Sequence, residues 1–300
     1  FAGLCHSDLH FMEGLYPHPA PAVLGHESAG IVEQVGSEVT YVKPGDHVIT
    51  CLSVFCGTCE QCTSGRPVIC TNTDVKMLPG EARRLEWEKP DQLHTFVNLS
   101  SFAEQMLVHE NALVKIQNDM PLDRAALIGC GVITGFGAAV NTANVRFGET
   151  VAVIGCGGVG MAAINGAHVA GAGRIFAVDT NPVKLQLATK LGATDLINPN
   201  DGDPVERIME LTKGGVNQSI ECLGLKKTAE QSFEMLAVGG TATIVGMVPI
   251  DQKIEISGFA FLRERRIQGS SMGSNRFRTD MPSLIDLYLQ GRLHLDDWIS

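Results

Sequence analysis

Four closely spaced cysteines are the residues of this chain with the most specific chemistry. They follow the pattern C-x2-C-x2-C-x7-C, and they are Cys56, Cys59, Cys62 and Cys70. Four thiolates form the complete tetrahedral shell of a structural zinc ion, and short loops bring the sulfur atoms together at little entropic cost. A redox pair, a disulfide framework and ordinary buried cysteines are the alternatives, but disulfide frameworks are typical of small secreted domains. The spacing therefore predicts a structural zinc site.

A second set of metal-ligating side chains is spread along the chain. Cys5, His26 and Cys130 could supply two thiolates and one imidazole, which leave the fourth position of a catalytic zinc open. These residues lie far apart in the sequence, so their spacing alone does not establish a site. Taken singly, such a cysteine is more often a small buried residue, and such a histidine is more often hydrogen-bonded and structural.

A glycine-rich turn indicates a dinucleotide site. The apolar run Thr150–Ile154 leads into the sequence GCGGVG and a helix of small residues, and a second expected strand ends at Asp179. In this context G-x-G-x-x-G is the dinucleotide fingerprint, and the helix N-terminus supplies N–H groups to the phosphates. A carboxylate at Asp179 would bind the ribose hydroxyls and repel a 2′-phosphate, so NAD is favoured over NADP. The alternative is a glycine turn without a ligand. The residues of the motif are Gly155, Gly157, Gly158, Val159 and Gly160.

Composition restricts the class of protein. A length of 300 residues suggests about two domains, and an apolar fraction of 44% with 33 glycines fits a glycine-rich α/β protein. The 23 basic and 33 acidic residues give a net charge of −10, which argues against a nucleic-acid partner. We expect no uncharged apolar run of the roughly 18 to 20 residues that span a membrane, and hence no membrane partner. Nine cysteines favour a reducing compartment, so we expect a cytoplasmic protein.

The elements that must position these residues change character along the chain. Residues 30–35 and 47–51 are short β-branched runs separated by turn residues, so the first part should be rich in strands. Residues 71–101, which include the charged run 81–88, should form a surface loop with some local structure. From Thr150 onward strands and helices alternate, as in a doubly wound parallel sheet.

Taken together, these motifs resemble those of the zinc-containing alcohol dehydrogenases of the medium-chain dehydrogenase/reductase family. The matching segments occur in the family's order and cover essentially the whole chain: GLCHSDLH, GHESAGIVEQVG, the four-cysteine lobe, IGCGVITGFGAAVNTA and VIGCGGVG. The resemblance implies an α/β protein with a GroES-like, β-rich catalytic domain and a doubly wound parallel-sheet (Rossmann) nucleotide-binding domain. It places the catalytic domain in residues 1–131, the NAD-binding domain in 132–271, and an incomplete return segment of the catalytic domain in 272–300. Both termini are expected to be cut.

The resemblance also implies roles for individual residues. Cys5, His26 and Cys130 match the ligands of the catalytic zinc, and Glu27 matches a carboxylate beside the metal. Asp8 matches the carboxylate that orients the zinc-bound histidine, a role expected on physical grounds. Ser7 and His10 match the residues of the proton path, and Thr134 and Val159 match residues near the nicotinamide. Lys184 matches a lysine at the ribose, and Leu52 matches a position in the substrate pocket.

The implied function is reversible hydride transfer between primary or secondary alcohols and NAD, with two zinc ions per chain and aldehydes or ketones as products. One alternative is the glutathione-dependent formaldehyde dehydrogenase branch, which usually has a tyrosine at the position of His10 and acidic residues that are not evident in 13–21. The other is an inactive, zinc-stabilised binding protein, against which the intact motifs argue. Residues 71–101 resemble the loop that dimeric members retain, so a homodimer is expected, with a homotetramer as the alternative.

Overall fold

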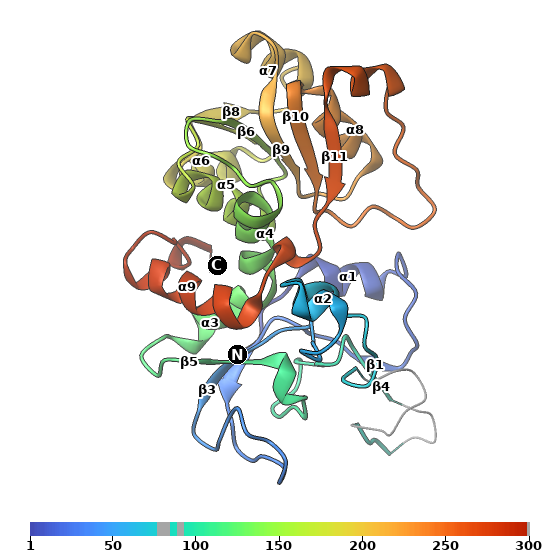
Figure 1. The fold of residues 1–300 in the computed structure, drawn as a ribbon, viewed down its shortest axis with the longest axis vertical. Helices are drawn as coiled ribbons and strands as arrows, with labels where there is room; N and C mark the ends of the chain where they lie inside the picture. The colour runs from blue at the N-terminus through green and yellow to red at the C-terminus, as the bar shows by residue number, and fades with distance from the viewer. Residues whose placement is uncertain (77–84, 89–92, 299–300) are drawn as a thin grey trace. The chain divides into compact units, whose positions relative to one another are not determined.

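The structure is a computed structural model that describes residues 1–76, 85–88 and 93–298. The chain divides into two units (Figure 1): Phe1–Ile133 with Asn275–Asp296, and Thr134–Ser274 with the end of the chain from Asp297. These divisions lie near the boundaries predicted after residues 131 and 271. Of the predicted loop 71–101, residues 77–84 and 89–92 lie outside the described residues, and with them half of the charged run 81–88. We call the two parts the catalytic unit and the nucleotide unit.

The catalytic unit contains a three-stranded antiparallel sheet in the order β2-β3-β5, formed by β2 (Ala29–Ile31), β3 (His47–Thr50) and β5 (Leu113–Ile116). A second, parallel pair joins β1 (Ala22–Val23) and β4 (His94–Thr95). The predicted strand 30–35 ends early at Ile31. Val32 instead exchanges backbone hydrogen bonds with Gly45 and Asp46, and the chain leaves the ladder at this turn.

The helices of the catalytic unit come from both ends of the sequence. They are α1 (His6–Met12), α2 (Glu60–Thr63), α3 (Leu122–Leu127) and α9 (Phe277–Leu289). Arg278 of α9 donates hydrogen bonds to the carbonyl oxygens of Leu113 and Glu110 at 3.2 and 2.8 Å. Its guanidinium also lies 3.6 Å from the centre of the Tyr41 ring, within the range of a cation–π contact. The return segment is therefore tied to β5 by polar contacts as well as by packing.

The nucleotide unit is built on a six-stranded parallel sheet in the order β11-β10-β9-β6-β7-β8 (Figure 1). The strands are β6 (Thr150–Ile154), β7 (Arg174–Val178), β8 (Asp195–Ile197), β9 (Val216–Glu221), β10 (Leu236–Ile244) and β11 (Arg266–Gly269). The helices are α4 (Ile133–Gly137), which begins at the boundary between the units, α5 (Gly158–Val169), α6 (Pro182–Lys190), α7 (Pro204–Thr212) and α8 (Lys226–Glu234).

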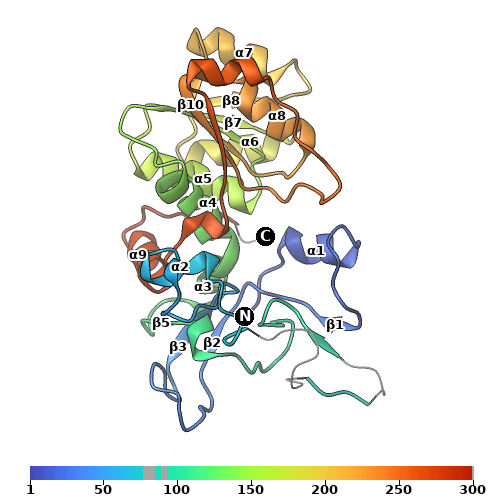
Figure 2. The ribbon, with the colours of Figure 1, turned by 45° about the vertical axis from the view of Figure 1, so that its right-hand side comes forward.

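Both faces of this sheet are buried, and β6 shows why. Val151 and Val153 pack with residues of α5 and α6, whereas Ala152 and Ile154 pack with Ile208 of α7 and residues of α8. Alternate residues of a strand point to opposite faces, so a strand covered on both sides is a continuous apolar run. Figure 2 shows these helices around the sheet. The predicted doubly wound parallel sheet is confirmed.

Short helical turns complete the described chain. They are the 3₁₀ turns η1 (Pro67–Ile69), η2 (Glu110–Ala112), η5 (Gly258–Arg263), η6 (Met272–Ser274) and η7 (Asp296–Trp298), and the π-helical turns η3 (Ile128–Val132) and η4 (Ala138–Thr142). The continuous segment Leu122–Thr142 has a mean hydropathy of 1.5 and is long and apolar enough to cross a membrane. The expectation that no such run exists was therefore wrong. However, 67% of this window is buried inside the protein, as in a core helix.

Candidate metal centres and dinucleotide site

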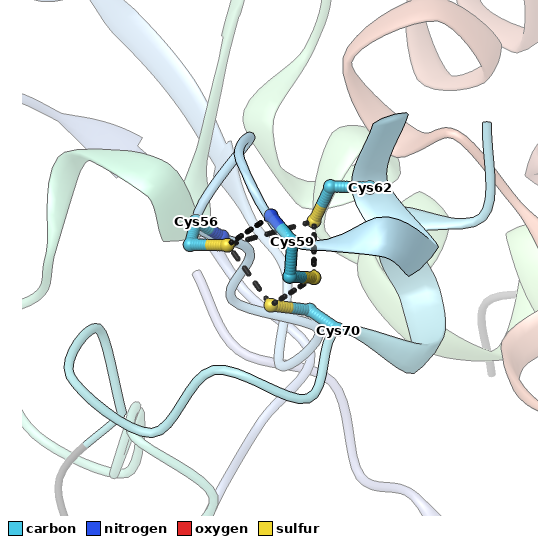
Figure 3. Close-up of side chains that lie close together, drawn as sticks. All are labelled: Cys56, Cys59, Cys62 and Cys70. Atoms are coloured by element: carbon cyan, nitrogen blue, oxygen red, sulfur yellow. Dashed lines mark hydrogen bonds between the residues drawn. The ribbon is translucent and has the colours of Figure 1, made fainter. Parts of the chain in front are cut away.

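The four predicted cysteines of the lobe direct their sulfur atoms toward one point (Figure 3). The Sγ–Sγ distances are 3.9 Å for Cys56 and Cys62, 3.5 Å for Cys59 and Cys62, and 3.8 Å for Cys59 and Cys70. Tetrahedral zinc with bonds of about 2.3 Å requires sulfur atoms about 3.8 Å apart. All four ligand atoms lie within 4.8 Å of one another. The residues present therefore fit a structural zinc ion.

Local backbone geometry favours the thiolate form of Cys56 and Cys59, whereas burial raises the pKa of Cys62 to about 12. Gly57 has φ +79°, a conformation that L side chains rarely adopt, and the turn aims the N–H of Cys59 at Cys56 Sγ, 3.2 Å away. Hydrogen bonds from the Thr58 hydroxyl and from backbone N–H groups lower the pKa of Cys56 to about 7. Backbone hydrogen bonds from Cys62 and Thr71 lower the pKa of Cys59 to about 5. Thiolates are the zinc ligands, so these bonds favour the form that binds metal.

The three dispersed ligands also come together. The ligand atoms of Cys5, His26 and Cys130 lie within 4.8 Å of one another, with His26 Nε2 3.2 Å from Cys130 Sγ. Cys5 precedes α1, His26 lies between β1 and β2, and Cys130 lies in η3. Within the described residues this triad and the four-cysteine lobe are the two groups of three or more side chains arranged to hold a metal. Three ligands leave a fourth position of tetrahedral zinc for water or substrate.

Asp8 holds the imidazole of His26 in this arrangement. Its Oδ1 atom lies 3.2 Å from His26 Nδ1 and accepts the backbone N–H of Gly25 at 2.9 Å. Nδ1–H therefore points to the carboxylate, and Nε2 faces the two sulfur atoms. Although burial opposes it, hydrogen bonds that the imidazole donates to Asp8 and Cys5 raise the pKa of His26 to about 10. Metal ligands must lose their protons, so zinc binding would displace a proton here.

Glu27 is a buried carboxylate next to the triad. It is 5% exposed, and its Oε1 atom accepts the backbone N–H of Gly131 at 2.9 Å. Burial, and then the negative charge of Cys5, raises the pKa of Glu27 to about 8. The hydrogen bond from Cys130 lowers the pKa of Cys5 to about 4, against the effect of burial. The hydrogen bond with Cys5, and then burial, raises the pKa of Cys130.

The predicted proton-path and pocket residues lie in the same unit. Ser7 is half-buried in the first turn of α1, and His10 lies one turn further along with its Nδ1 atom buried and without a hydrogen-bond partner in the described chain. Burial, and then the proximity of His6, lowers the pKa of His10. Leu52 follows β3 and packs against the small core that includes Val54 and two other buried residues. The structure places Ser7 and His10 on the helix that also carries Asp8.

In the nucleotide unit, the glycine turn has the shape that the motif predicts. Gly155 directly follows β6 with φ +90°, and a Cβ atom on Gly160 would lie 1.7 Å from the carbonyl oxygen of Gly155. Gly157 is the N-cap of α5, and Gly158 is the first residue of the helix. A Cβ atom added to either glycine would have no neighbouring atom within 4 Å. The turn therefore tolerates no side chain at Gly160 and leaves open space where the helix begins, as a bound phosphate requires.

Asp179 closes this turn at the end of β7. Its Oδ2 atom accepts the N–H of Cys156 at 2.8 Å, and its Oδ1 atom accepts the N–H of Asn181 at 2.8 Å. Lys184 follows in the first turn of α6, whose N-cap is Asn181. The predicted ribose-binding carboxylate is thus held beside the phosphate-binding turn, as expected when parallel strands end at one edge of a sheet.

The two predicted nicotinamide contacts also lie near each other. A Cβ atom on Gly135 would lie 1.9 Å from the carbonyl oxygen of Val159, so α4 and α5 approach closely at this glycine. Thr134, the residue before it, is buried and donates a hydrogen bond to Met272 Sδ at 3.3 Å. Close helix contact at Gly135 therefore brings Thr134 and Val159 into one region.

Sequence reasoning missed residues that support the site of Cys5, His26 and Cys130. Gly25 and Gly131 donate the N–H groups that hold Asp8 and Glu27. His6 lies edge-on to His10 with ring centres 4.7 Å apart, and its i, i+4 spacing on a helix could have indicated this contact. Gly25 and Gly131 donate through their backbone and carry no side chain, so the sequence gives no signal of their contacts.

Comparison with known proteins gives matches along nearly the whole chain. Residues 1–118 match the family described as alcohol dehydrogenase GroES-like domain, and residues 158–290 match the family described as zinc-binding dehydrogenase. Alcohol dehydrogenase 1 of Trifolium repens is 38% identical over 308 residues, which cover 100% of this chain and 81% of that protein. The S-(hydroxymethyl)glutathione dehydrogenase of Photobacterium damsela subsp. piscicida is 39% identical over 305 residues, which cover 99% and 83% respectively.

A solved structure gives the same result. Benzyl alcohol dehydrogenase from Acinetobacter calcoaceticus superposes with a TM-score of 0.90 at 35% identity, covering 98% of this chain and 81% of that protein.

Proposed function

The chain belongs to the zinc-containing alcohol dehydrogenases of the medium-chain dehydrogenase/reductase family, and from this premise we propose which of its residues perform the reaction and which alcohols it prefers. It is an oxidoreductase that uses zinc and NAD and acts on small-molecule alcohols. The observation that carries the assignment of residues is the convergence of Cys5, His26 and Cys130, whose ligand atoms lie within 4.8 Å.

We propose that Cys5, His26 and Cys130 hold the catalytic zinc, which when bound acts as a Lewis acid on an alcohol or carbonyl oxygen. Asp8 fixes the orientation of His26 through the hydrogen bond to Nδ1. Glu27 remains beside the ligands as a buried carboxyl group held by the N–H of Gly131. The second zinc belongs to the four-cysteine lobe, where it stabilises the fold.

The nucleotide unit binds and orients the cofactor. The turn after β6 would supply backbone N–H groups to the pyrophosphate, and Asp179 with Lys184 would hold the adenosine ribose, which favours NAD over NADP. Thr134 and Val159 would contact the nicotinamide. Hydride transfer itself is the chemistry of the cofactor, and the protein supplies position and electrostatics.

Ser7 and His10 provide the route for the alcohol proton to reach solvent. Both residues lie on α1, which begins directly after the ligand Cys5. We expect His10→Gln to slow alcohol oxidation by roughly 10²-fold below neutral pH, because general-base assistance is typically worth about 10²–10⁴-fold. Added buffer bases should restore part of the rate. Pre-steady-state NADH formation measures this effect, and an unchanged rate of hydride transfer would remove His10 from the proton path.

His18→Gln is the matched control for this variant. His18 is also half-buried in the catalytic unit, and its Nε2 atom is likewise buried without a partner in the described residues. It lies on no proposed proton path, so its replacement should not create a dependence on buffer base. A buffer effect of equal size in both variants would contradict the role of His10.

We propose medium-chain and aryl primary alcohols as the preferred substrates. Ser7 stands where many family members have the bulkier threonine, and Leu52 occupies a position that is often aromatic, so both leave space beside the reacting carbon. The similarity to a benzyl alcohol dehydrogenase supports this preference. S-(hydroxymethyl)glutathione is the second candidate substrate, because relatives of equal similarity carry that name.

A substrate series with Leu52→Phe tests this proposal. We expect kcat/KM of the unmodified enzyme to be higher for benzyl alcohol than for ethanol, and the variant to reduce this ratio about tenfold or more. The reason is that each methylene-sized difference in a pocket is worth roughly 1–3 kcal/mol in discrimination. Steady-state NADH production with ethanol, hexanol, benzyl alcohol and S-(hydroxymethyl)glutathione gives the values. Ethanol as the best substrate would reject the size argument, and the glutathione adduct as the best would favour the second candidate.

We propose a homodimer that forms through the outer edge of β11, with a homotetramer as the alternative, in a cytoplasmic setting. An edge strand presents backbone N–H and C=O groups that a second copy can pair. Exposed apolar residues of the same unit support an interface: Phe259 is 73% exposed, Leu262 77% and Ile250 69%. We expect light scattering to give twice the chain mass, and Phe259→Glu with Leu262→Glu to give the monomer mass. A monomeric unmodified protein would contradict the proposal.

A further inference from the structure

A buried carboxylate ends β9 in the nucleotide unit. Glu221 has no exposed surface, and it pairs in register with Ile154, the last residue of β6 before the glycine turn. From β6 the chain continues to β7 on one side, whereas β9 lies on the other side. Strand order therefore reverses between β6 and β9, and open parallel sheets bind ligands beyond the carboxyl ends of the strands at such a point.

One oxygen of this carboxylate holds the loop that follows β9. Glu221 Oε1 accepts the backbone N–H groups of Leu223 and Gly224, each at 2.9 Å, and the hydroxyl of Thr228 in α8 at 2.7 Å. Gly224 has φ +81°, and a Cβ atom there would lie 2.6 Å from the backbone nitrogen of Met247. These three hydrogen bonds and this close approach together define the conformation of the loop in the structure.

The loop in turn forms a wall beside the cofactor turn. Leu223 Cγ lies 2.6 Å from the position that a Cβ atom on Gly155 would occupy, so Leu223 packs directly on the first glycine of the fingerprint. The Leu223 side chain remains 45% exposed at this edge of the sheet. Any shift of the Leu223 backbone would consequently change the surface next to Gly155.

We propose that Glu221 is a positioning residue for NAD: it holds the loop after β9, and with it Leu223, in the conformation that the cofactor requires beside the glycine turn. The inference rests on the use of NAD by the family and adds a residue outside the fingerprint. The Oε1 atom of Glu221 accepts three hydrogen bonds, which gives this oxygen the partners that a buried polar atom requires. Its second oxygen, Oε2, is buried without a partner in the described residues, so the three bonds to Oε1 carry the role.

Two replacements of Glu221 separate its acceptor role from its volume. Glu221→Gln keeps an acceptor oxygen and the shape, so the dissociation constant for NADH should rise no more than about threefold. Glu221→Met keeps the volume and leaves the two N–H groups without an acceptor, so the constant should rise about tenfold or more. Fluorescence titration with NADH gives both values. An unchanged constant in the methionine variant, or equal losses in both variants, would overturn the proposal.

Amide hydrogen exchange in the protein without cofactor provides a readout that does not depend on turnover. The amides of Leu223 and Gly224 should exchange about tenfold or more faster in Glu221→Met than in the unmodified protein, because loss of their acceptor allows local opening. Glu149→Gln is the matched control. Glu149 also accepts a backbone N–H, from Arg146 at 2.9 Å, but it precedes β6 at the opposite edge of the sheet. This control should change neither NADH affinity nor the exchange of the two amides.

A further variant keeps the test valid if Glu221→Met does not fold. Leu223→Ala preserves all three hydrogen bonds of Glu221 and removes the wall, so NADH affinity should fall about fivefold with unchanged exchange at Gly224. Unchanged NADH affinity in Leu223→Ala would overturn the proposal. Failure of the unmodified protein to bind NADH would instead overturn the assignment of the cofactor.

Discussion

Replacing Cys130 by serine will lower kcat for alcohol oxidation by about 10³-fold or more. Cys130 Sγ lies 3.2 Å from His26 Nε2, and with the thiolate removed two ligands remain to hold the Lewis acid on which the reaction depends. Metal analysis should find the zinc content reduced from two to one per chain. Steady-state NADH formation measures the loss of turnover, and the circular dichroism spectrum should stay that of the unmodified protein.

Cys51→Ser provides the matched control for this prediction. Cys51 is fully buried and close enough to Cys130 to affect its pKa, but it belongs to neither ligand group. We expect its replacement to retain two zinc ions and most of the turnover. Loss of zinc or activity comparable to that of Cys130→Ser would mean that buried thiols in this region are structural and that the proposed triad is wrong.

Cys59→Ser will release the zinc of the four-cysteine lobe and destabilise the protein. The binding free energy of a structural zinc ion is also folding free energy, so we expect a loss of about 3 kcal/mol or more. For a protein of this size such a loss lowers the melting temperature by roughly 5 °C. Calorimetry and metal analysis measure the two effects, and initial turnover at low temperature should change much less than stability.

Thr63→Ala is the matched control, because Thr63 lies in α2, the short helix whose N-cap is Cys59, and it belongs to neither ligand group. Its hydroxyl donates to backbone carbonyls on an exposed surface, so the replacement should keep both zinc ions and cost less than about 1 kcal/mol. A Cys59→Ser protein with two zinc ions and an unchanged melting temperature would contradict the structural zinc site.

Local spacing made some of these features predictable from the sequence. The four lobe cysteines lie within one short segment, so their convergence follows from chain connectivity, and the glycine turn lies between a strand and a helix that are adjacent in the chain. The catalytic triad is different. His26 and Cys130 are 104 residues apart in the chain, and the fold places Cys130, which lies in η3, next to His26. Resemblance to a family, rather than spacing, predicted that set.

Features that depend on tertiary register were not predictable in this way. Glu221 cannot be distinguished in the sequence from an ordinary charged residue near the end of a strand. In the fold β9 pairs with both β6 and β10, and the loop after β9 and Thr228 of α8 contact the buried carboxyl group. The apolar segment Leu122–Thr142 was misjudged for a related reason. Its composition matches that of a membrane span, and packing inside the protein accounts for its apolar character.

The contacts of Arg278 have a consequence for the order in which the chain is completed during synthesis. The nucleotide unit is almost continuous in sequence, from Thr134 to Ser274, and its sheet needs no residue from elsewhere. The catalytic unit, by contrast, gains α9 and the Arg278 bonds to the carbonyls of Leu113 and Glu110 only after residue 278 has left the ribosome. Although its metal ligands are made first, the catalytic unit is therefore the later of the two to be finished. During that interval the surface of β5 that α9 covers must be shielded from other chains, which makes α9 a determinant of folding yield as well as of stability.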